Sequence, residues 1–151
     1  MAGLTLVVNA GSTSLKLSFV DGDESHRVDS FDARADLVVH RIVHGGERFR
    51  APVVIDDDVV VELERLVELA PLHQTPALAA LRDARRVLPD VPHVAVFDTA
   101  FHATLPPVAS TYAVPPSLGI RRFGFHGLAV QSVSEQVPVA RLVVCHLGGG
   151  C

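Results

Sequence analysis

A short polar turn between two apolar segments opens the chain, and it constrains the fold more than any other feature. Residues 4–8 are apolar, and residues 15–20 alternate between apolar and polar side chains. Alternation with a period of two predicts a hairpin of two strands, with Lys16 on the face opposite to the apolar side chains. The turn between them consists of Asn9, Ala10, Gly11, Ser12, Thr13 and Ser14.

This turn has the composition of a phosphate-binding loop. Gly11 can adopt backbone conformations closed to other residues, and the small side chains would let an anion approach the backbone amides. Lys16 is the only lysine of the chain and Asn9 the only asparagine, and both belong to this stretch. An ordinary hairpin loop with an exposed lysine remains an alternative.

The composition is that of one soluble globular domain. The chain has 151 residues, 48% of them apolar, and a formal net charge of −4. No basic field is available for nucleic acids or anionic membranes, and without tryptophan a base-stacking surface is not expected. The only two cysteines, Cys145 and Cys151, make no disulfide framework. With no visible signal peptide and no apolar run of ~18–20 residues, we expect a cytoplasmic protein.

Further strands and helices are expected to alternate after the hairpin. The pattern predicts strands at 26–31, 37–43, 53–55, 94–97 and 140–145, a loop at 104–117 and a helix at 128–137. Three aspartates at 56–58 predict a helix that Pro71 ends. A second helix is expected to start with Thr75 as its cap and Pro76 in its first turn, and to stop at Pro89.

Antiparallel strands followed by alternating helices and strands predict an α/β sheet with helices on its faces. In such sheets, ligands bind beyond the carboxyl ends of the strands. Polar or glycine-rich groups stand at those ends: Asn9, Gly45, Gly46, Asp98 and His146.

Arg41 and Asp98 are candidates for binding and catalysis. An arginine on a strand that faces a cleft can hold a carboxylate or phosphate through two parallel hydrogen bonds. An aspartate after a buried strand can accept a proton, orient a hydroxyl or hold a metal-bound water. The alternatives are a surface ion pair for Arg41 and a turn or helix cap for Asp98.

Two histidines next to glycines are further candidates. Glycines on either side of Phe125 and His126 indicate a backbone pressed close to a neighbouring group, where His126 could donate to developing negative charge. His146, followed by Leu147 and the glycines 148–150, could take a phosphate on backbone amides. For His126, and more so for His73, a hydrogen-bonded core histidine is the alternative.

Six blocks in this order resemble the acetate kinase (acetokinase) family, which also includes propionate and butyrate kinases. The resemblance extends from about Leu4 to the last residue. The blocks are residues 9–16, 40–47, 71–73, 97–102, 122–127 and 146–148, and those at 97–102 and 122–127 are the most specific. They argue against the remaining alternative, a kinase of the same superfold that acts on a sugar.

The resemblance implies an actin-like, ribonuclease-H-like fold and an acetate kinase reaction, in which ATP and acetate give ADP and acetyl phosphate with Mg²⁺. It implies a cytoplasmic homodimer. By match to the family's motifs, Asp98 and His126 are the catalytic residues, Arg41 binds the carboxylate or acyl phosphate, and Asn9 is associated with magnesium. The implied ATP-phosphate contacts are Ser12, Ser14, Lys16, His146, Leu147, Gly148, Gly149 and Gly150.

The chain also departs from the family pattern. Gly149 replaces an asparagine, residues 128–130 replace Thr-Ser-His, and residues 21–36 are shorter than the family's helical insertion. By comparison with the family, residues 1–139 are expected to be the N-terminal domain that binds the acyl substrate and phosphate. Residues 140–151 are expected to be the first strand and glycine turn of a second, missing nucleotide-binding domain. The alternative to an enzyme is therefore an inactive truncated or split module that binds phosphate, carboxylate or a partner domain.

Overall fold

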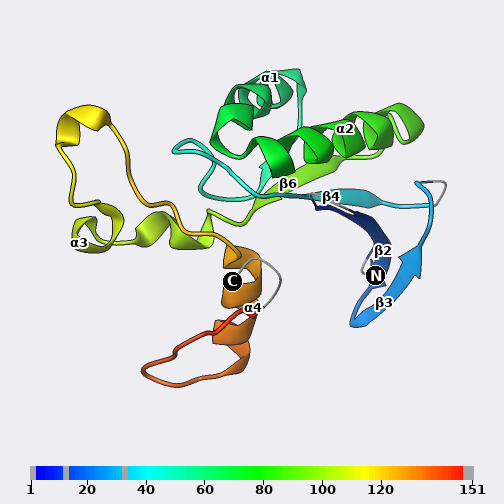
Figure 1. Ribbon diagram of the computed structural model, residues 1–151. Coiled ribbons are helices and arrows are strands. Elements are labelled where there is room, and N and C mark those ends of the chain that lie inside the picture. The colour runs from blue at the N-terminus through cyan, green and yellow to red at the C-terminus, as the bar shows by residue number, and fades with distance from the viewer. Residues whose placement is uncertain (1–2, 12–13, 32–33, 148–151) are drawn as a thin grey trace.

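The computed structural model describes residues 3–11, 14–31 and 34–147. Within these ranges, six strands form one mixed sheet in the order β3-β2-β1-β4-β6-β5 (Figure 1). The strands are β1 (Thr5–Ala10), β2 (Leu15–Asp21), β3 (Glu24–Val28), β4 (Leu37–Ile42), β5 (Val53–Val54) and β6 (His93–Phe97). β1, β4 and β6 run parallel, whereas β2, β3 and β5 each pair antiparallel. The opening hairpin and the mixed sheet are confirmed.

The two faces of the sheet differ in burial. Alternate residues of β1 are buried in the hydrophobic core, Val8 among them, and the residues between them are half-buried. β4 follows the same period, and in the parallel register Val8 pairs with His40 while Asn9 pairs with Arg41. Since strand side chains alternate, His40 faces the core and Arg41 faces the opposite side.

Two helices cover the buried face. In Figure 1, α1 (Asp57–Arg65) and α2 (Pro71–Val87) lie above the sheet, and α4 (Gly127–Gln136) lies below it. Asp56 caps α1 because its carboxylate accepts the Val59 N–H at 2.8 Å. The shorter elements are η1 (Leu66–Leu69), η2 (Phe101–Thr104), α3 (Pro107–Ser110) and η3 (Pro116–Leu118). Of the helices described, none has the length and apolar character needed to cross a membrane.

The expected boundary between the first two helices is wrong. α2 starts at Pro71, so Thr75 is not its cap and Pro76 lies inside the helix. α1 ends earlier, at Arg65, and the chain continues as η1. Ala70 leaves the helical region, with φ −154° and ψ 61°, because a residue before proline avoids the α conformation. Proline is then well suited to the first position of the next helix.

The extra turn of α2 is stabilised by burial. Gln74 is fully buried, and it lies three and four positions before the buried Ala77 and Leu78. This spacing places all three side chains on the face of the helix that packs on the sheet. The packing outweighs the backbone hydrogen bond that Pro76 removes inside the helix.

Residues 140–145 do not form the expected strand. They are irregular, and Val143 is 88% exposed. A strand needs a neighbour to pair its backbone groups, and no described strand of the sheet pairs with this segment. The expected loop at 104–117 also contains α3 and the start of η3.

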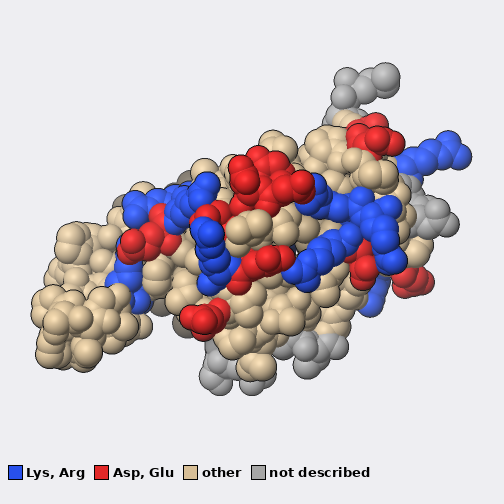
Figure 2. Space-filling model, turned by 90° about the horizontal axis from the view of Figure 1, so that it is seen from above, with Lys and Arg blue, Asp and Glu red and all other residues tan. Residues whose placement is uncertain are grey.

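The outer surface of the two helices is a mixed-charge surface. Figure 2, which views the molecule from above, shows acidic and basic side chains interleaved across this side. Arg85 lies 2.9 Å from Asp57, and Arg86 lies 2.9 Å from Asp83. Exposed pairs of this kind contribute about 0–1 kcal/mol each, so this surface mainly keeps the helices solvated.

Candidate active site

The predicted site residues meet at the carboxyl ends of the parallel strands. Asn9, near the end of β1, pairs with Lys16 on β2 and with Arg41 on β4. Asp98 directly follows β6, which pairs with β4. Residues from three distant parts of the sequence, the first hairpin, β4 and the end of β6, therefore lie side by side, as expected for a site at this edge of an α/β sheet.

Arg41 and Asp98 form a two-point ion pair. The Nε of Arg41 donates to Oδ1 of Asp98 at 3.2 Å, and a terminal nitrogen donates to Oδ2 at 2.5 Å. The other terminal nitrogen donates to Oδ1 of Asn9 at 3.1 Å. The Asp98 side chain is only 2% exposed and that of Arg41 is 25% exposed. The guanidinium therefore compensates a buried carboxylate and still reaches solvent.

A polar cavity of about 470 Å³ opens at this ion pair. Its lining comprises Asn9, Lys16, Arg41, Asp98, His126, Leu128, Ala129 and His146. The rings of His126 and His146 lie 4.5 Å apart between centroids. Five separate parts of the chain thus contribute charged or hydrogen-bonding groups to one cavity, and the cations among them suit an anionic ligand.

His126 has an unusual backbone conformation. It is the only non-glycine residue with positive φ in the described parts of the chain, at φ 56°. Such a conformation is strained for a side chain with a Cβ and requires support from its surroundings. Strained residues of this kind gather at functional sites, which agrees with the choice of His126 as a candidate.

Two glycines let the loop of His126 dock against the loop of Asp98. A Cβ on Gly127 would lie 2.0 Å from the Asp98 carbonyl oxygen, and one on Gly124 would lie 2.6 Å from the His102 ring. The Gly127 N–H donates to the same Asp98 oxygen at 3.0 Å. His102 Nε2 lies 3.0 Å from the Phe125 carbonyl oxygen, which it can approach only as a donor. The predicted close approach of this backbone is therefore confirmed.

A second cavity, of about 410 Å³, adjoins the first. It is lined by Arg41, Val43, Leu69, Ala70, His73, Phe125 and His126. Sequence reasoning proposed neither Val43 nor Phe125 as a site residue and favoured a core position for His73. Val43 lies two residues after Arg41 and is therefore on the same side of an extended chain. This spacing was a signal from which Val43 could have been predicted as a site residue.

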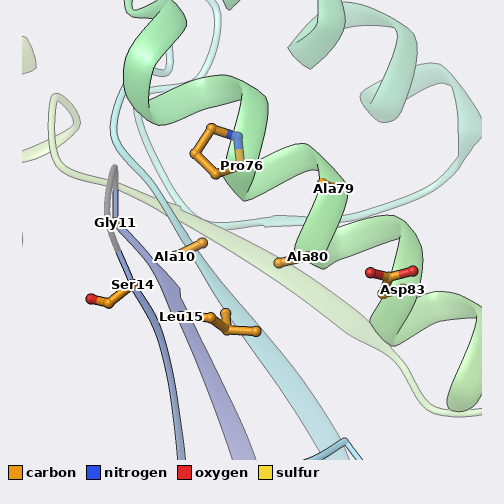
Figure 3. Close-up of a pocket in the computed structure, with 8 residues that line it drawn as sticks. All are labelled: Ala10, Gly11, Ser14, Leu15, Pro76, Ala79, Ala80 and Asp83. Atoms are coloured by element: carbon orange, nitrogen blue, oxygen red, sulfur yellow. The ribbon is translucent and has the colours of Figure 1, made fainter.

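The proposed phosphate contacts are only partly brought together. Lys16 lines the polar cavity, and Leu147 is 84% exposed and lines neither cavity. Ser14 lines a groove on the other side of the hairpin, although its hydroxyl points away from α2 (Figure 3). Four proposed contacts lie outside the described residues: Ser12, Gly148, Gly149 and Gly150.

The groove beside Ser14 has a different character from the candidate site. It runs between the hairpin and α2 and is lined mainly by small or apolar side chains, with Asp83 at one end (Figure 3). Asp83 is already paired with Arg86 at 2.9 Å. None of the described residues that line this groove carries a positive charge.

A match to a known family covers most of the chain. Residues 23–151 match the acetokinase family. The chain belongs to this family. The mixed sheet with helices that the described residues form confirms the fold class expected from the sequence.

Several acetate kinases are close in sequence. The chain is 49% identical to acetate kinase 2 of Listeria monocytogenes serotype 4b (strain F2365), over 74% of this chain and 31% of that protein. It is 50% identical to the acetate kinase of Arthrobacter sp. (strain FB24), over 79% of this chain and 34% of that protein. The chain thus spans about a third of the length of these relatives.

Two solved structures in the family share the fold. A propionate kinase from Francisella tularensis subsp. tularensis SCHU S4 has a TM-score of 0.80 and 29% identity, over 90% of this chain and 48% of that one. The acetate kinase of Porphyromonas gingivalis has a TM-score of 0.78 and 28% identity, over 89% of this chain and 48% of that one. The actin-like, ribonuclease-H-like fold is therefore shown.

Membership of the family implies a magnesium ion, and the side-chain oxygens at the polar cavity can be compared with the ligands that such an ion needs. No group of three His, Cys, Asp or Glu side chains that could hold a metal occurs within residues 3–11, 14–31 and 34–147. Asn9 and Asp98 line the cavity and carry side-chain oxygens, which already accept from Arg41. Mg²⁺ usually takes one or two protein oxygens and fills its other positions with water and phosphate. These two residues fit an ion that takes one or two oxygens from the protein and its remaining ligands from elsewhere.

A pair of buried histidines lies on the opposite face of β4 from Arg41. His40 Nε2 lies 2.9 Å from His93 Nδ1, and His93 Nε2 lies 3.0 Å from the Leu88 carbonyl oxygen. Because a carbonyl only accepts, His93 donates from Nε2 and His40 donates to its Nδ1. The remaining nitrogen, His40 Nδ1, is buried with no partner among the described residues. Burial, and secondarily His93, lower the pKa of His40 to about 3.

Proposed function

We propose that this chain carries the carboxylate-binding half of a site that transfers a phosphoryl group between ATP and a short-chain carboxylate such as acetate. One observation carries the proposal. The polar cavity and the partly apolar cavity share Arg41 and His126. A carboxylate held at this junction would have its alkyl group beside Val43 and Phe125 and its reacting oxygen directed at the polar cavity.

Cationic groups would supply most of the catalysis. Phosphoryl transfer needs in-line positioning of the reactants and neutralisation of charge on the transferred group more than covalent chemistry. In our proposal Arg41 binds the carboxylate, and Lys16 and His126 donate to phosphate oxygens. The residues at 146–150 would contact the phosphates of ATP. The fixed, strained backbone of His126 holds its ring in place before the substrates arrive.

Asp98 would act mainly through Arg41. Both of its carboxylate oxygens accept from this guanidinium. A short-chain carboxylate is ionised at neutral pH, so its attacking oxygen has no proton to remove. We therefore propose that Asp98 orients Arg41 during the forward reaction. With Asn9, it would also lie next to a nucleotide-bound magnesium ion, which would neutralise phosphate charge.

The adenosine of ATP would be bound by the other half of such a site. This part of the proposal is supported by the share of the acetate kinase relatives that the chain spans, 31–34%. That half would come from a nucleotide-binding domain, in the same polypeptide or in a partner, and a homodimer is the expected assembly. The enzyme would work in the cytoplasm.

Binding and turnover test the proposal separately. Titration of the ¹⁵N-labelled chain with acetate, propionate and inorganic phosphate should shift resonances of Arg41, Val43 and His126. Hydroxylamine trapping after addition of ATP, Mg²⁺ and acetate measures acyl phosphate. If the chain alone binds a carboxylate but forms no acyl phosphate, the alternative of an inactive binding module is favoured for this chain. Absence of any carboxylate binding would overturn the proposal.

Variants identify the residues. Arg41→Ala should abolish carboxylate binding, and His126→Ala should leave binding within about three-fold while it removes most of any turnover, about 100-fold or more. Arg86→Ala, which alters an exposed arginine that lines neither cavity, is the matched control. Unchanged binding in the Arg41 variant would contradict its assignment.

A further inference from the structure

The turn that follows β4 forms part of the wall of the candidate site. It comprises Val43, His44, Gly45 and Gly46, and Val43 lines the cavity beside Arg41. A Cβ on Gly45 would lie 2.4 Å from the Phe49 carbonyl oxygen, and Gly46 has φ +61°. The backbone of this turn is therefore closely packed, and its position decides where the wall of the cavity stands.

Gln74 attaches this turn to α2. Its side chain is fully buried, and its Nε2 donates to the His44 carbonyl oxygen at 3.0 Å. Its Oε1 accepts the His44 N–H at 3.4 Å. One amide side chain thus satisfies both backbone groups of a residue thirty positions away. Burial of an amide without such partners would cost free energy of folding. An apolar side chain, by contrast, could pack in this place without needing any hydrogen bond.

Thr99 attaches the same turn to the segment after β6. Its Oγ1 accepts the Gly45 N–H at 2.9 Å, and the residue is 4% exposed. Thr99 directly follows Asp98, the partner of Arg41. The turn is therefore tied at two consecutive residues to two different parts of the core.

His44 extends this connection to the loop of His126. Its ring packs edge-on against Phe123, with centroids 4.6 Å apart, and against Phe125, with centroids 5.7 Å apart. Its Nδ1 accepts the Gly46 N–H at 2.9 Å, which fixes the ring orientation. A shift of the turn would thus move both Val43 and the aromatic residues that precede His126.

We propose that Gln74 and Thr99 are positioning residues of this site, which hold the turn 43–46 so that Val43 and the loop of His126 enclose the carboxylate next to Arg41. The identity of the ligand rests on the proposed function, whereas the clamp on the turn does not. Neither residue lines either cavity, so both would act through the turn rather than by touching the substrate.

Paired variants test the clamp without any ligand. Gln74→Met keeps the length of the side chain and removes both hydrogen bonds, and Thr99→Val keeps the shape and removes the acceptor. We expect amide hydrogen exchange at His44 and Gly45 to become about ten-fold faster or more, with exchange in β1 and β2 unchanged. Thr99→Ser, which keeps the hydroxyl, should restore slow exchange at Gly45. Gln136→Met, on exposed α4, is the matched control.

Ligand titrations separate positioning from general stability. In the Gln74 and Thr99 variants, propionate should bind about five-fold more weakly, while inorganic phosphate, held by Lys16 and Arg41, should change less than about two-fold. Unchanged exchange at the turn, or an equal loss of both ligands, would overturn the proposal. If the unaltered chain binds no carboxylate, the proposed function fails, but the clamp can still be judged. Faster amide exchange at the turn and a shifted Arg41 Nε–H resonance in the variants would support it. No change in either measurement would overturn it.

Discussion

His40 and Arg41 are neighbours on β4, yet they lie in opposite electrostatic environments. His40 is 1% exposed beneath the helices, and its pKa is lowered to about 3 by burial and, secondarily, by His93. The side chain of Arg41 is 25% exposed at the edge of a cavity, and the carboxylate of Asp98 matches its charge. The helix-covered face accommodates a titratable group by keeping it neutral, whereas the open face accommodates the buried charge of Asp98 by pairing it with Arg41. Stability on one face and ligand binding on the other can therefore be perturbed separately.

Acid should produce the largest effect, and it acts on the His40 face. In the unfolded chain His40 gains a proton below its ordinary pKa of 6.5, whereas in the fold its pKa is about 3. Between about pH 3 and pH 6.5 the unfolded state binds more protons than the folded state. The contribution of His40 to the free energy of unfolding is therefore fully present above pH 6.5 and falls as the pH decreases. The total loss from His40 is roughly 4–5 kcal/mol by pH 3. Burial also lowers the pKa of His44 and of His93, which adds to the loss.

Urea unfolding between pH 7 and pH 5 measures this dependence mostly above the range in which carboxylates titrate. The slope should approach about 1.4 kcal/mol per pH unit near pH 5 for His40 alone. His40→Leu should reduce the slope and leave phosphate binding at the other face unchanged. A slope that is the same in both proteins would contradict the role assigned to His40.

Removal of the charge on the open face should be nearly as destabilising. Arg41→Ala leaves the buried carboxylate of Asp98 without its partner, and we expect the free energy of unfolding to fall by about 3–5 kcal/mol. The exposed pair of Arg86 and Asp83 offers the comparison, since Arg86→Ala should change stability by less than about 0.5 kcal/mol. Chemical denaturation of both variants measures the difference, and the double variant Arg41→Ala/Asp98→Ala should recover part of the loss.

The smallest effect on stability should come from Lys16, which lines the same cavity on an exposed part of β2. Lys16→Ala removes no buried partner, so the free energy of unfolding should change by less than about 0.5 kcal/mol. Phosphate binding should nevertheless weaken about ten-fold at low salt, with a smaller effect at high salt because ionic screening already weakens the attraction. Isothermal titration at two salt concentrations provides the measurement. Equal phosphate affinity in the unaltered chain and the Lys16→Ala variant would contradict the assignment of Lys16 to the site.

Local patterns predicted a large part of this fold and site. Period-two alternation predicted the hairpin, and polar residues after apolar runs predicted the strand ends that carry Asn9 and Asp98. The glycines around His126 predicted close backbone contact. These signals are local, because they depend on side-chain periodicity and on backbone conformations open only to some residues.

Longer-range packing decided where the local patterns misled. Pro71 was expected to end a helix, and it begins one because the turn after it buries Gln74 against the sheet. Residues 140–145 have the apolar composition of a strand, but no described strand pairs with them. A strand and a helix boundary both depend on neighbours that are distant in the sequence.

The sequence by itself determined the types of chemical group available and the strand ends at which they stand, because both follow from residue identity and period. Only the tertiary structure decided that His40 becomes a neutral buried base while Arg41 pairs with Asp98, because burial and partners depend on which elements cover each face. It also brought Gln74 and Thr99 onto three backbone groups of the turn after β4, namely the N–H and carbonyl of His44 and the N–H of Gly45. Side-chain contacts across such distances have no local signature, since they arise only when the sheet and helices pack together.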